Sequence, residues 1–265
     1  MSRSSRSSAL AAAAALTLVA CGSNDAPAAS RTGTPGGPAA VTGDITVFAA
    51  SSLTETFTRL GKDFEAANPG AKVTFNFGGS SALAQQINSG APADVFASAA
   101  PANMKQVSDA GGVSGSPKTF VRNKLQIAVP AGNPGKVTGL ADLAKQDLKI
   151  ALCAEQVPCG AAARKALQAA GVTAAPDTLE QDVKAVLTKV SLGEVDAALV
   201  YRTDVKAAGG KVEGIAFPEA DQAVNDYPIA TLAKAPNAAG AKAFVDFVLS
   251  DKGRAVLGAA GFDGP

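Results

Sequence analysis

The stretch ITVFAASSLTETFTRLGKDF, residues 45–64, joins a strand pattern to a helix pattern through two adjacent serines. Residues 45–49 are mostly β-branched or apolar, which predicts a short strand. Ser52 and Glu55 fit the S-x-x-E capping box, and apolar residues then recur at helical spacing up to Phe64. We therefore expect a strand, a tight turn in which Ser52 caps the next helix, and that helix.

The same order of patterns returns in VTFNFGGSSALAQQI, residues 73–87, and a third strand pattern follows at 95–97. A second set lies further along the chain, with predicted strands at 125–129, 148–152 and 197–200 and predicted helices at 161–170 and 182–192. Alternating strands and helices indicate a parallel sheet with helices on its faces. The predicted fold class is therefore α/β, built from two sets of units.

Extended segments between the two sets predict two lobes separated by a cleft. The crossovers are expected near 119–124 and 224–228, with the C-terminal segment returning to the first lobe. This places residues 44–122 and 226–265 in lobe one and residues 123–225 in lobe two.

The candidate binding residues follow predicted strands, where ligands of open α/β sheets bind. Ser52, Ser80, Cys159 and Tyr201 all occupy such positions. Hydroxyls and free backbone N–H groups at the start of a helix suit an anion. Taken singly, Ser52 or Ser80 is explained as well by N-capping, and Tyr201 by a structural role at a strand end. Two doubled-serine turns in one lobe favour a ligand.

The first twenty residues have the pattern of an export signal. Arg3 and Arg6 precede an apolar, alanine-rich run, and residues 18–22 read LVACG, which resembles a bacterial lipobox. Residues 1–20 are therefore predicted to be a lipoprotein signal peptide and Cys21 the lipidated residue. The alternatives are a signal peptide that is cleaved and leaves an unmodified cysteine, or a signal peptide that is retained. The Ser-, Pro- and Gly-rich segment up to residue 43 predicts a flexible tether.

The composition excludes several function classes. The chain has no histidine, which removes the commonest general base, and a serine nucleophile would lack an activating partner. Its formal net charge of +1 is too small for the positively charged surface that nucleic-acid-binding proteins present. The sequence favours a binding protein; an exported hydrolase with paired carboxylates and a surface adhesin are alternatives without a supporting motif.

Cys153 and Cys159 are the remaining cysteines. Their spacing does not fit a zinc site, and no histidine is present to complete one. In an exported protein a disulfide between them is expected, with two free thiols as the alternative.

Several motifs in sequence order resemble the molybdate-binding proteins of bacterial ABC importers. They are ITVFAASSL at 45–53, GSSALAQQI at 79–87, GAPADVF at 90–96, VPCG at 157–160, LVY at 199–201 and DYPIA at 226–230. The resemblance covers residues 44–264. It implies a two-lobed periplasmic-binding-protein fold of type II, with a mixed sheet in each lobe and the ligand in the interlobe cleft. It also implies a transported ligand, molybdate or tungstate, and no resident cofactor or enzymatic activity.

The resemblance also implies which residues hold the anion. Ser52 and Ser80 would donate hydroxyl and main-chain N–H groups, Cys159 and Val183 main-chain N–H groups, and Tyr201 its O–H. The family often has alanine where Cys159 stands, and Ser51 replaces another usual alanine, so Ser51 competes with Ser52 for the contact. The predicted site is donor-only, with no carboxylate and no direct metal ligand. The expected partners are an importer permease and, through the Cys21 anchor, a membrane; the expected state is a monomer. Another tetrahedral oxyanion such as sulfate is the alternative ligand.

Overall fold

The computed structural model describes residues 40–265. The predicted signal peptide 1–20, the lipidated Cys21 and most of the predicted tether lie outside the described residues. The first strand, β1 (Thr42–Ala50), begins before the expected domain start at residue 44, because Thr42 and Gly43 already pair with the neighbouring strand. Within residues 40–265 no helix is long and apolar enough to cross a membrane.

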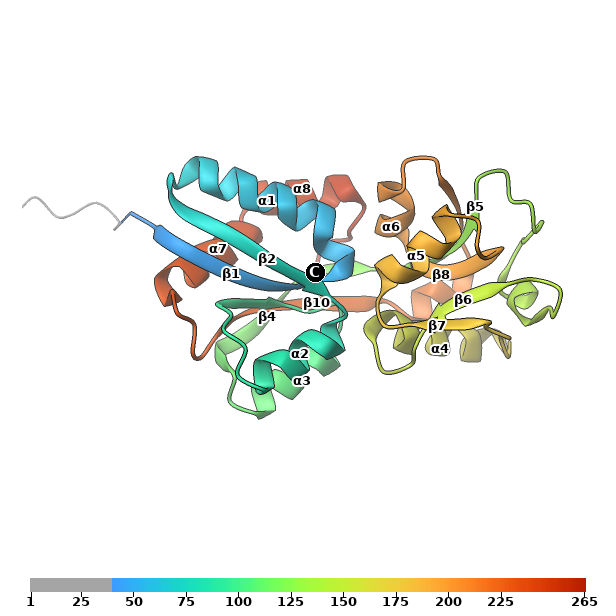
Figure 1. Ribbon diagram of the computed structural model, residues 1–265, viewed down its shortest axis with the longest axis horizontal. Coiled ribbons are helices and arrows are strands. Elements are labelled where there is room, and N and C mark those ends of the chain that lie inside the picture. Colours follow the sequence, from blue (N-terminus) through green and yellow to red (C-terminus); the bar gives the residue numbers. More distant parts are fainter. Residues whose placement is uncertain (1–39) are drawn as a thin grey trace, which may run out of the picture. The chain divides into compact units, whose positions relative to one another are not determined.

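The first lobe is built on a five-stranded mixed sheet (Figure 1). The strand order is β2 (Gly70–Gly78), β1, β3 (Val95–Ala97), β10 (Asn225–Leu232) and β4 (Val113–Asn123). The first three strands are parallel, and β10 runs antiparallel to both of its neighbours. The predicted strands at 45–49, 73–77 and 95–97 are confirmed.

Helices cover both faces of this sheet (Figure 1). One face packs against α1 (Thr54–Ala67), α7 (Ala238–Leu249) and α8 (Asp251–Ala260), through a phenylalanine-rich core. The other face packs against α2 (Ser80–Asn88) and α3 (Pro101–Asp109). A short 3₁₀ turn, η1 (Ser51–Leu53), links β1 to α1 and lies at the end of the sheet that faces the second lobe.

The second lobe has its own five-stranded mixed sheet and core. The strand order is β7 (Thr178–Glu180), β6 (Ile150–Cys153), β8 (Ala197–Tyr201), β5 (Leu125–Pro130) and β9 (Val212–Ile215). Its helices are η2 (Leu140–Ala144), α4 (Pro158–Ala170), α5 (Val183–Ser191), α6 (Arg202–Ala207) and η3 (Pro218–Gln222). The two-lobed α/β fold with mixed sheets is thus confirmed.

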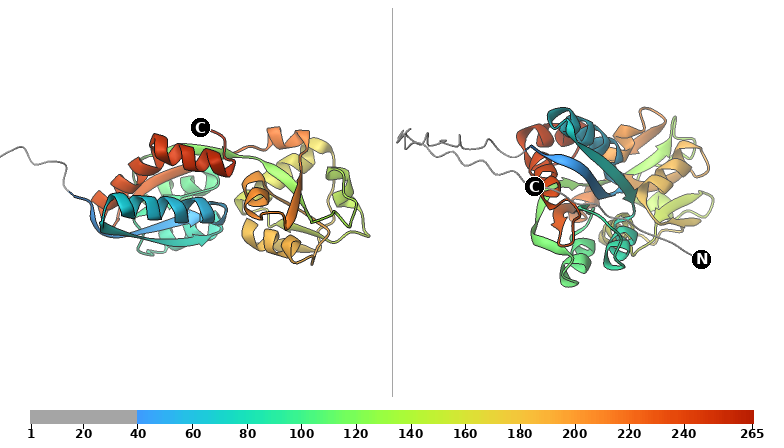
Figure 2. Two further views of the ribbon diagram at one scale, coloured as in Figure 1. Left: turned by 90° about the horizontal axis from the view of Figure 1, so that it is seen from above. Right: turned by 60° about the vertical axis from the view of Figure 1, so that its left-hand side comes forward.

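Two chain segments cross between the lobes (Figure 2). One runs from β4 into β5 at Lys124, and the other enters β10 at Asn225. The two crossover strands pair antiparallel, and their register places Asn225 opposite Asn123. These paired strands connect the two lobes.

Candidate functional site

A small cavity lies where the two lobes meet. It is lined from the first lobe by Ala50, Ser51, Ser52, Gly78, Gly79, Ser80 and Ala99, and from the second by Val157, Pro158, Cys159, Asp182, Val183 and Tyr201. All five sequence-predicted site residues are in this lining. The cavity volume is about 10 Å³, close to what one water molecule needs. In this conformation the cavity excludes a sugar or a peptide and suits only a very small ligand.

Ser52 does not cap α1, so the predicted capping box is wrong. Residues 51–53 form the η1 turn, α1 begins only at Thr54, and no side chain caps either helix start. The Ser52 hydroxyl instead lies 2.9 Å from the Tyr227 hydroxyl, in a buried contact between residues far apart in sequence. Glu55, the other half of the expected box, forms an ion pair with Lys184 of the second lobe. Ser51 also lines the cavity, so the structure leaves both serines beside it.

Ser80 is the first residue of α2, and its side chain is almost fully buried. Its Oγ accepts a 2.9 Å hydrogen bond from the N–H of Ala99, which follows β3. A backbone N–H only donates, so the Ser80 hydroxyl keeps its own hydrogen for another acceptor. The preceding Gly79 lies close to the second lobe: a Cβ there would come within 2.4 Å of Gln181 O.

Cys159 lies in the first turn of α4, which begins at Pro158 and not at the predicted residue 161. Proline at the first helical position needs no N–H partner, so the earlier start is the favourable one. The predicted disulfide between Cys153 and Cys159 is present and ties the end of β6 to this turn. Gly160 allows the close approach, because a Cβ there would lie 2.0 Å from Ala154 O.

Val183 is the first residue of α5, which Asp182 caps. The Asp182 carboxylate accepts hydrogen bonds from the N–H groups of Lys184 and Ala185, at 2.8 and 3.1 Å. Asp182 therefore places a carboxylate in the lining, which the sequence analysis did not expect, but its Oδ1 is engaged by the helix. Among the hydrogen bonds within residues 40–265, none uses the N–H of Val183 or of Cys159. Both are first-turn amides, which have no partner inside their helices.

Tyr201 ends β8 and is fully buried. Its hydroxyl accepts a 2.9 Å hydrogen bond from Asn225 Nδ2. Burial, followed by the neighbouring Tyr227, raises the pKa of Tyr201 well above its usual value. The phenol therefore stays protonated, and its O–H remains a donor.

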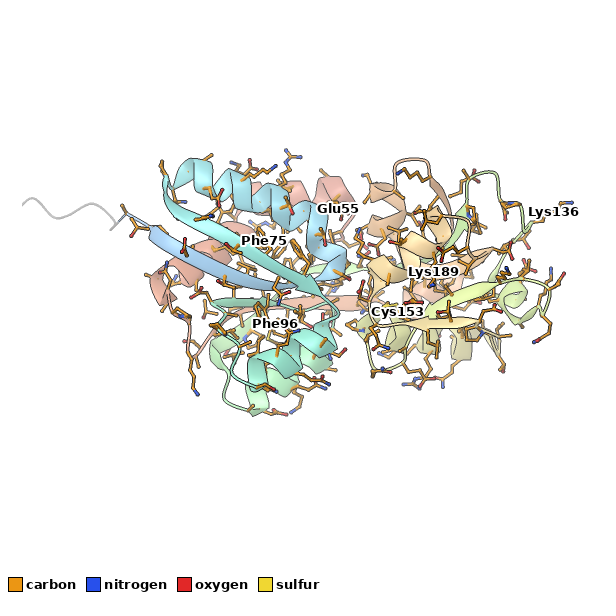
Figure 3. The ribbon with its side chains drawn as sticks, in the orientation of Figure 1. Glu55, Phe75, Phe96, Lys136, Cys153 and Lys189 are labelled. Atoms are coloured by element: carbon orange, nitrogen blue, oxygen red, sulfur yellow. A yellow bond between two sulfur atoms is a disulfide. The ribbon has the colours of Figure 1, made fainter. Side chains whose placement is uncertain are left out.

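A charged cluster crosses the lobe boundary next to the cavity. Lys184 Nζ contacts both carboxylate oxygens of Glu55 at 2.9 Å and lies 3.2 Å from Asp204 Oδ1. Asp204 is fully buried, and this oxygen makes no hydrogen bond, although it is within ion-pair distance of the ammonium group. Figure 3 shows Glu55 where α1 begins, at the border between the lobes, and Cys153 on the side of the second lobe that faces it.

Burial and charge act in opposite directions within this cluster. Burial raises the pKa of Asp204 to about 6, although Lys184 opposes the shift. Burial also lowers the pKa of Lys184, but Asp204 and Glu55 outweigh it and the net shift is upward. Lys184 is thus charged and already paired with carboxylates. Among residues 40–265, no lysine or arginine lines the cavity itself.

The sequence analysis missed the residues that lie behind the cavity. Asn123, Asn225 and Tyr227 are buried and reach Ser52 or Tyr201 through hydrogen bonds. All three lie at or beside the predicted crossovers, and Tyr227 also belongs to the DYPIA motif, but neither signal indicated a contact with the cavity residues. Within residues 40–265 no group of three acidic, histidine or cysteine side chains could hold a metal ion.

Comparison with known proteins agrees with the two-lobed fold. The chain is 45% identical over 248 residues to the molybdate-binding protein ModA of Mycobacterium tuberculosis, covering 94% of this chain and 93% of that protein. It is 32% identical over 224 residues to the putative ABC transporter substrate-binding lipoprotein YvgL of Bacillus subtilis, covering 82% and 85%. The periplasmic molybdate-binding protein of Azotobacter vinelandii shares the fold, with a TM-score of 0.74 at 23% identity over 83% of this chain and 99% of that one.

The family model for bacterial extracellular solute-binding proteins matches residues 45–263, which is nearly all of the described chain. Members of this family bind a solute outside the cell, and the cavity between the lobes of this chain offers hydroxyl and amide donors to a ligand. The chain belongs to the bacterial extracellular solute-binding proteins.

Proposed function

We propose that this protein captures molybdate, and also tungstate, between its lobes and delivers it to the permease of an ABC importer. The observation that carries the proposal is the chemistry of the cavity lining. It brings uncharged donors from both lobes to one small space, and among residues 40–265 no lysine or arginine lines that space. The name of the mycobacterial relative, at 45% identity, supports molybdate as the solute.

The proposed contacts combine hydroxyls with helix-start amides. Ser52 and Ser80 would donate from the first lobe, and Cys159, Val183 and Tyr201 from the second. A dianion gains up to about 2 kcal/mol at each partly buried helix start and more from charge-assisted hydrogen bonds. Because the donors are divided between the lobes, the anion would hold them together and closure would accompany binding.

Thermal denaturation in the presence of oxyanions tests the proposal. Ligand at a thousand times its Kd should stabilise the protein by about 4 kcal/mol. Molybdate and tungstate should therefore raise the Tm well above the value in chloride of equal ionic strength. A shift with sulfate but with neither molybdate nor tungstate would contradict the proposed ligand.

Two substitutions test the proposed contacts. Ser80→Ala and Tyr201→Phe each remove one hydroxyl donor and should weaken molybdate binding by about 1.5–3 kcal/mol, the range for a hydrogen bond to a charged group. Ser108→Ala is a matched control, because its hydroxyl bonds to Met104 O on α3, away from the cavity. Isothermal titration calorimetry gives the affinities, and unchanged values for both cavity variants would refute the assignment.

We further propose that Cys21 carries the lipid anchor that holds the protein at a membrane. The lipoprotein named among its relatives supports this. The Cys21→Ala variant should then leave the membrane fraction of the expressing cells and appear in the soluble fraction, whereas equal membrane retention would contradict the anchor.

A further inference from the structure

The short helix α6 of the second lobe lies against the C-terminal end of α8 in the first lobe (Figure 1). Gly261 caps this end, and a Cβ built there would lie 3.6 Å from Lys206 Cδ and 3.9 Å from Arg202 Nε. Both of these atoms belong to α6. Neither Arg202 nor Lys206 lines the cavity, so the lobes also meet at a contact that the proposed anion does not touch.

Two cationic side chains of α6 bind the end of α8. Lys206 Nζ donates a 2.8 Å hydrogen bond to Ala259 O. The Arg202 guanidinium donates to Gly261 O through Nε, at 2.9 Å, and also through Nη2. The last carbonyls of a helix have no partner within it and form the negative end of its dipole. Both cations therefore stabilise the end of α8 from the opposite lobe.

Arg202 also binds the chain that follows α8. Its Nη2 lies 2.9 Å from Asp263 Oδ1. Asp263 is fixed to the first lobe, because its N–H and C=O pair with Arg122 of β4 at 3.0 and 2.9 Å. The backbone N–H of Arg202 donates at 2.9 Å to Lys124 O, at a crossover between the lobes. Arg202 therefore joins the lobes beside the crossover, and Lys206 joins them one helical turn further along α6.

These contacts are coupled to the cavity through Tyr201, the residue directly before α6. The Tyr201 N–H donates a 3.1 Å hydrogen bond to Asp204 Oδ2, which fixes the tyrosine to the helix. An anion enclosed between the lobes leaves only when they separate. Separation that draws Tyr201 away from the first lobe also draws α6 away from α8. Release of the anion therefore works against the contacts of Arg202 and Lys206.

Apolar packing does not fill the space beside these contacts. A cavity of about 170 Å³ lies between α6, the start of α1 and the end of α8. Its lining includes Thr56 of α1, Ala207 of α6 and Phe262, which follows α8. Because side chains leave this part of the interface open, the two cations carry the contact between α6 and the first lobe.

We propose that Arg202 and Lys206 are positioning residues that hold the Tyr201 side of the cavity against the first lobe and thereby slow the release of the captured anion. The proposal rests on the proposed function, since it concerns the release of the same anion. Neither cation touches the anion, so both act on it through the position of the lobes alone. Salt screens partly exposed ionic contacts, so release should accelerate as the ionic strength rises.

Release of radiolabelled molybdate into an excess of unlabelled molybdate tests the proposal. Lys206→Met removes the ammonium group and should make release about two- to fivefold faster. Arg202→Gln removes the hydrogen bonds to Gly261 O and the ion pair with Asp263, and should make release about five- to twentyfold faster. The association rate should keep its wild-type value, because the anion enters the open form, in which these contacts are absent. Lys206→Arg keeps the charge and should restore wild-type release.

Arg254→Gln is the matched control for Arg202. The Arg254 guanidinium also binds a backbone carbonyl and a carboxylate, Leu249 O and Asp251, but both belong to the first lobe. Lys242→Met is the control for Lys206, because it breaks an ion pair inside α7. Neither control should change the release rate. A general loss of stability would lower the Tm and alter both rate constants, whereas a lost contact between the lobes accelerates release alone.

The proposal is wrong if Lys206→Met and Arg202→Gln release the anion at the wild-type rate, or if the controls accelerate release equally. Lys206 is exposed, so its variant decides the question even if Arg202→Gln folds poorly. Salt should accelerate release from wild type more than from the double variant, and an equal salt dependence would also contradict the proposal. If wild-type protein binds sulfate and not molybdate, the proposed function fails, and release of radiolabelled sulfate still decides the role of the two cations.

Discussion

Replacing Gly79 by alanine should keep the two lobes from closing fully. Gly79 has φ −61° and ψ 131°, which alanine adopts without strain. A Cβ at this position would lie 2.4 Å from Gln181 O, whereas ordinary contacts of a Cβ begin at 3.4 Å. Gln181 precedes α5 in the second lobe, so the lobes would have to separate there by about 1 Å.

The separation should weaken the anion contacts of the second lobe. Cys159, Val183 and Tyr201 are the proposed donors on that side. A hydrogen bond of about 2.9 Å that lengthens by about 1 Å is no longer a hydrogen bond. Each such bond to a charged ligand contributes about 1.5–3 kcal/mol. Losing one or two of them should therefore weaken molybdate binding by roughly 3 kcal/mol, about a hundredfold in Kd.

Calorimetric titration of Gly79→Ala with molybdate measures the loss, and small-angle scattering measures whether the ligand still makes the protein more compact. The Tm without ligand should change little, because the new contact forms only when the lobes approach. Gly258→Ala is the control, since a Cβ on that α8 residue meets nothing within 4 Å. Wild-type affinity together with normal compaction would refute this reasoning.

Two further predictions concern the charged cluster at the lobe boundary. Glu55→Gln removes the ion-pair partner of Lys184 on the other side of the lobe boundary. Molybdate should therefore dissociate about two- to fivefold faster, as measured by stopped-flow exchange. Glu194→Gln breaks an ion pair inside the second lobe and should not change the dissociation rate. Asp204 has a folded-state pKa of about 6, above its unfolded value, so the folded protein binds the extra proton and stability falls as pH rises through that range. Asp204→Asn should remove this pH dependence. The free energy of unfolding of wild type minus that of the variant, from urea denaturation, should be higher below pH 6 than above it. A difference that does not change with pH would contradict the assignment.

The strands and helices that position the cavity could be predicted from local patterns. Apolar runs followed by serine turns identified β1, β2 and the helices after them, and the Asp182 position marked the start of α5. These elements have buried, periodic faces, which leave a strong trace in the sequence. Their ends form the cavity, so Ser52, Ser80, Cys159 and Tyr201 could be found from their positions, whereas Val183 was implied only by the family resemblance.

Other parts of the structure could not be predicted from local sequence patterns. Most of β4 is exposed or half-buried, so it lacks the apolar alternation that indicates a strand. The six residues of α6 are too few to show a helical period. The role of Ser52 was assigned wrongly because S-x-x-E is a local signal, whereas its actual partner, Tyr227, lies 175 residues away and is brought to it only by the fold.

The antiparallel pairing of the two crossover strands has a consequence for the order of events in capture. Ser52 and Ser80 are oriented by Tyr227 and Ala99, which belong to their own lobe. Tyr201 is oriented by Asn225, at the start of a strand of the opposite lobe. When the lobes are apart, Ser52 and Ser80 would therefore keep their orientation, whereas Tyr201 would lose its contact with Asn225. The oxyanion would bind to the two serines first, and the Tyr201 hydroxyl would become ordered only when the lobes close.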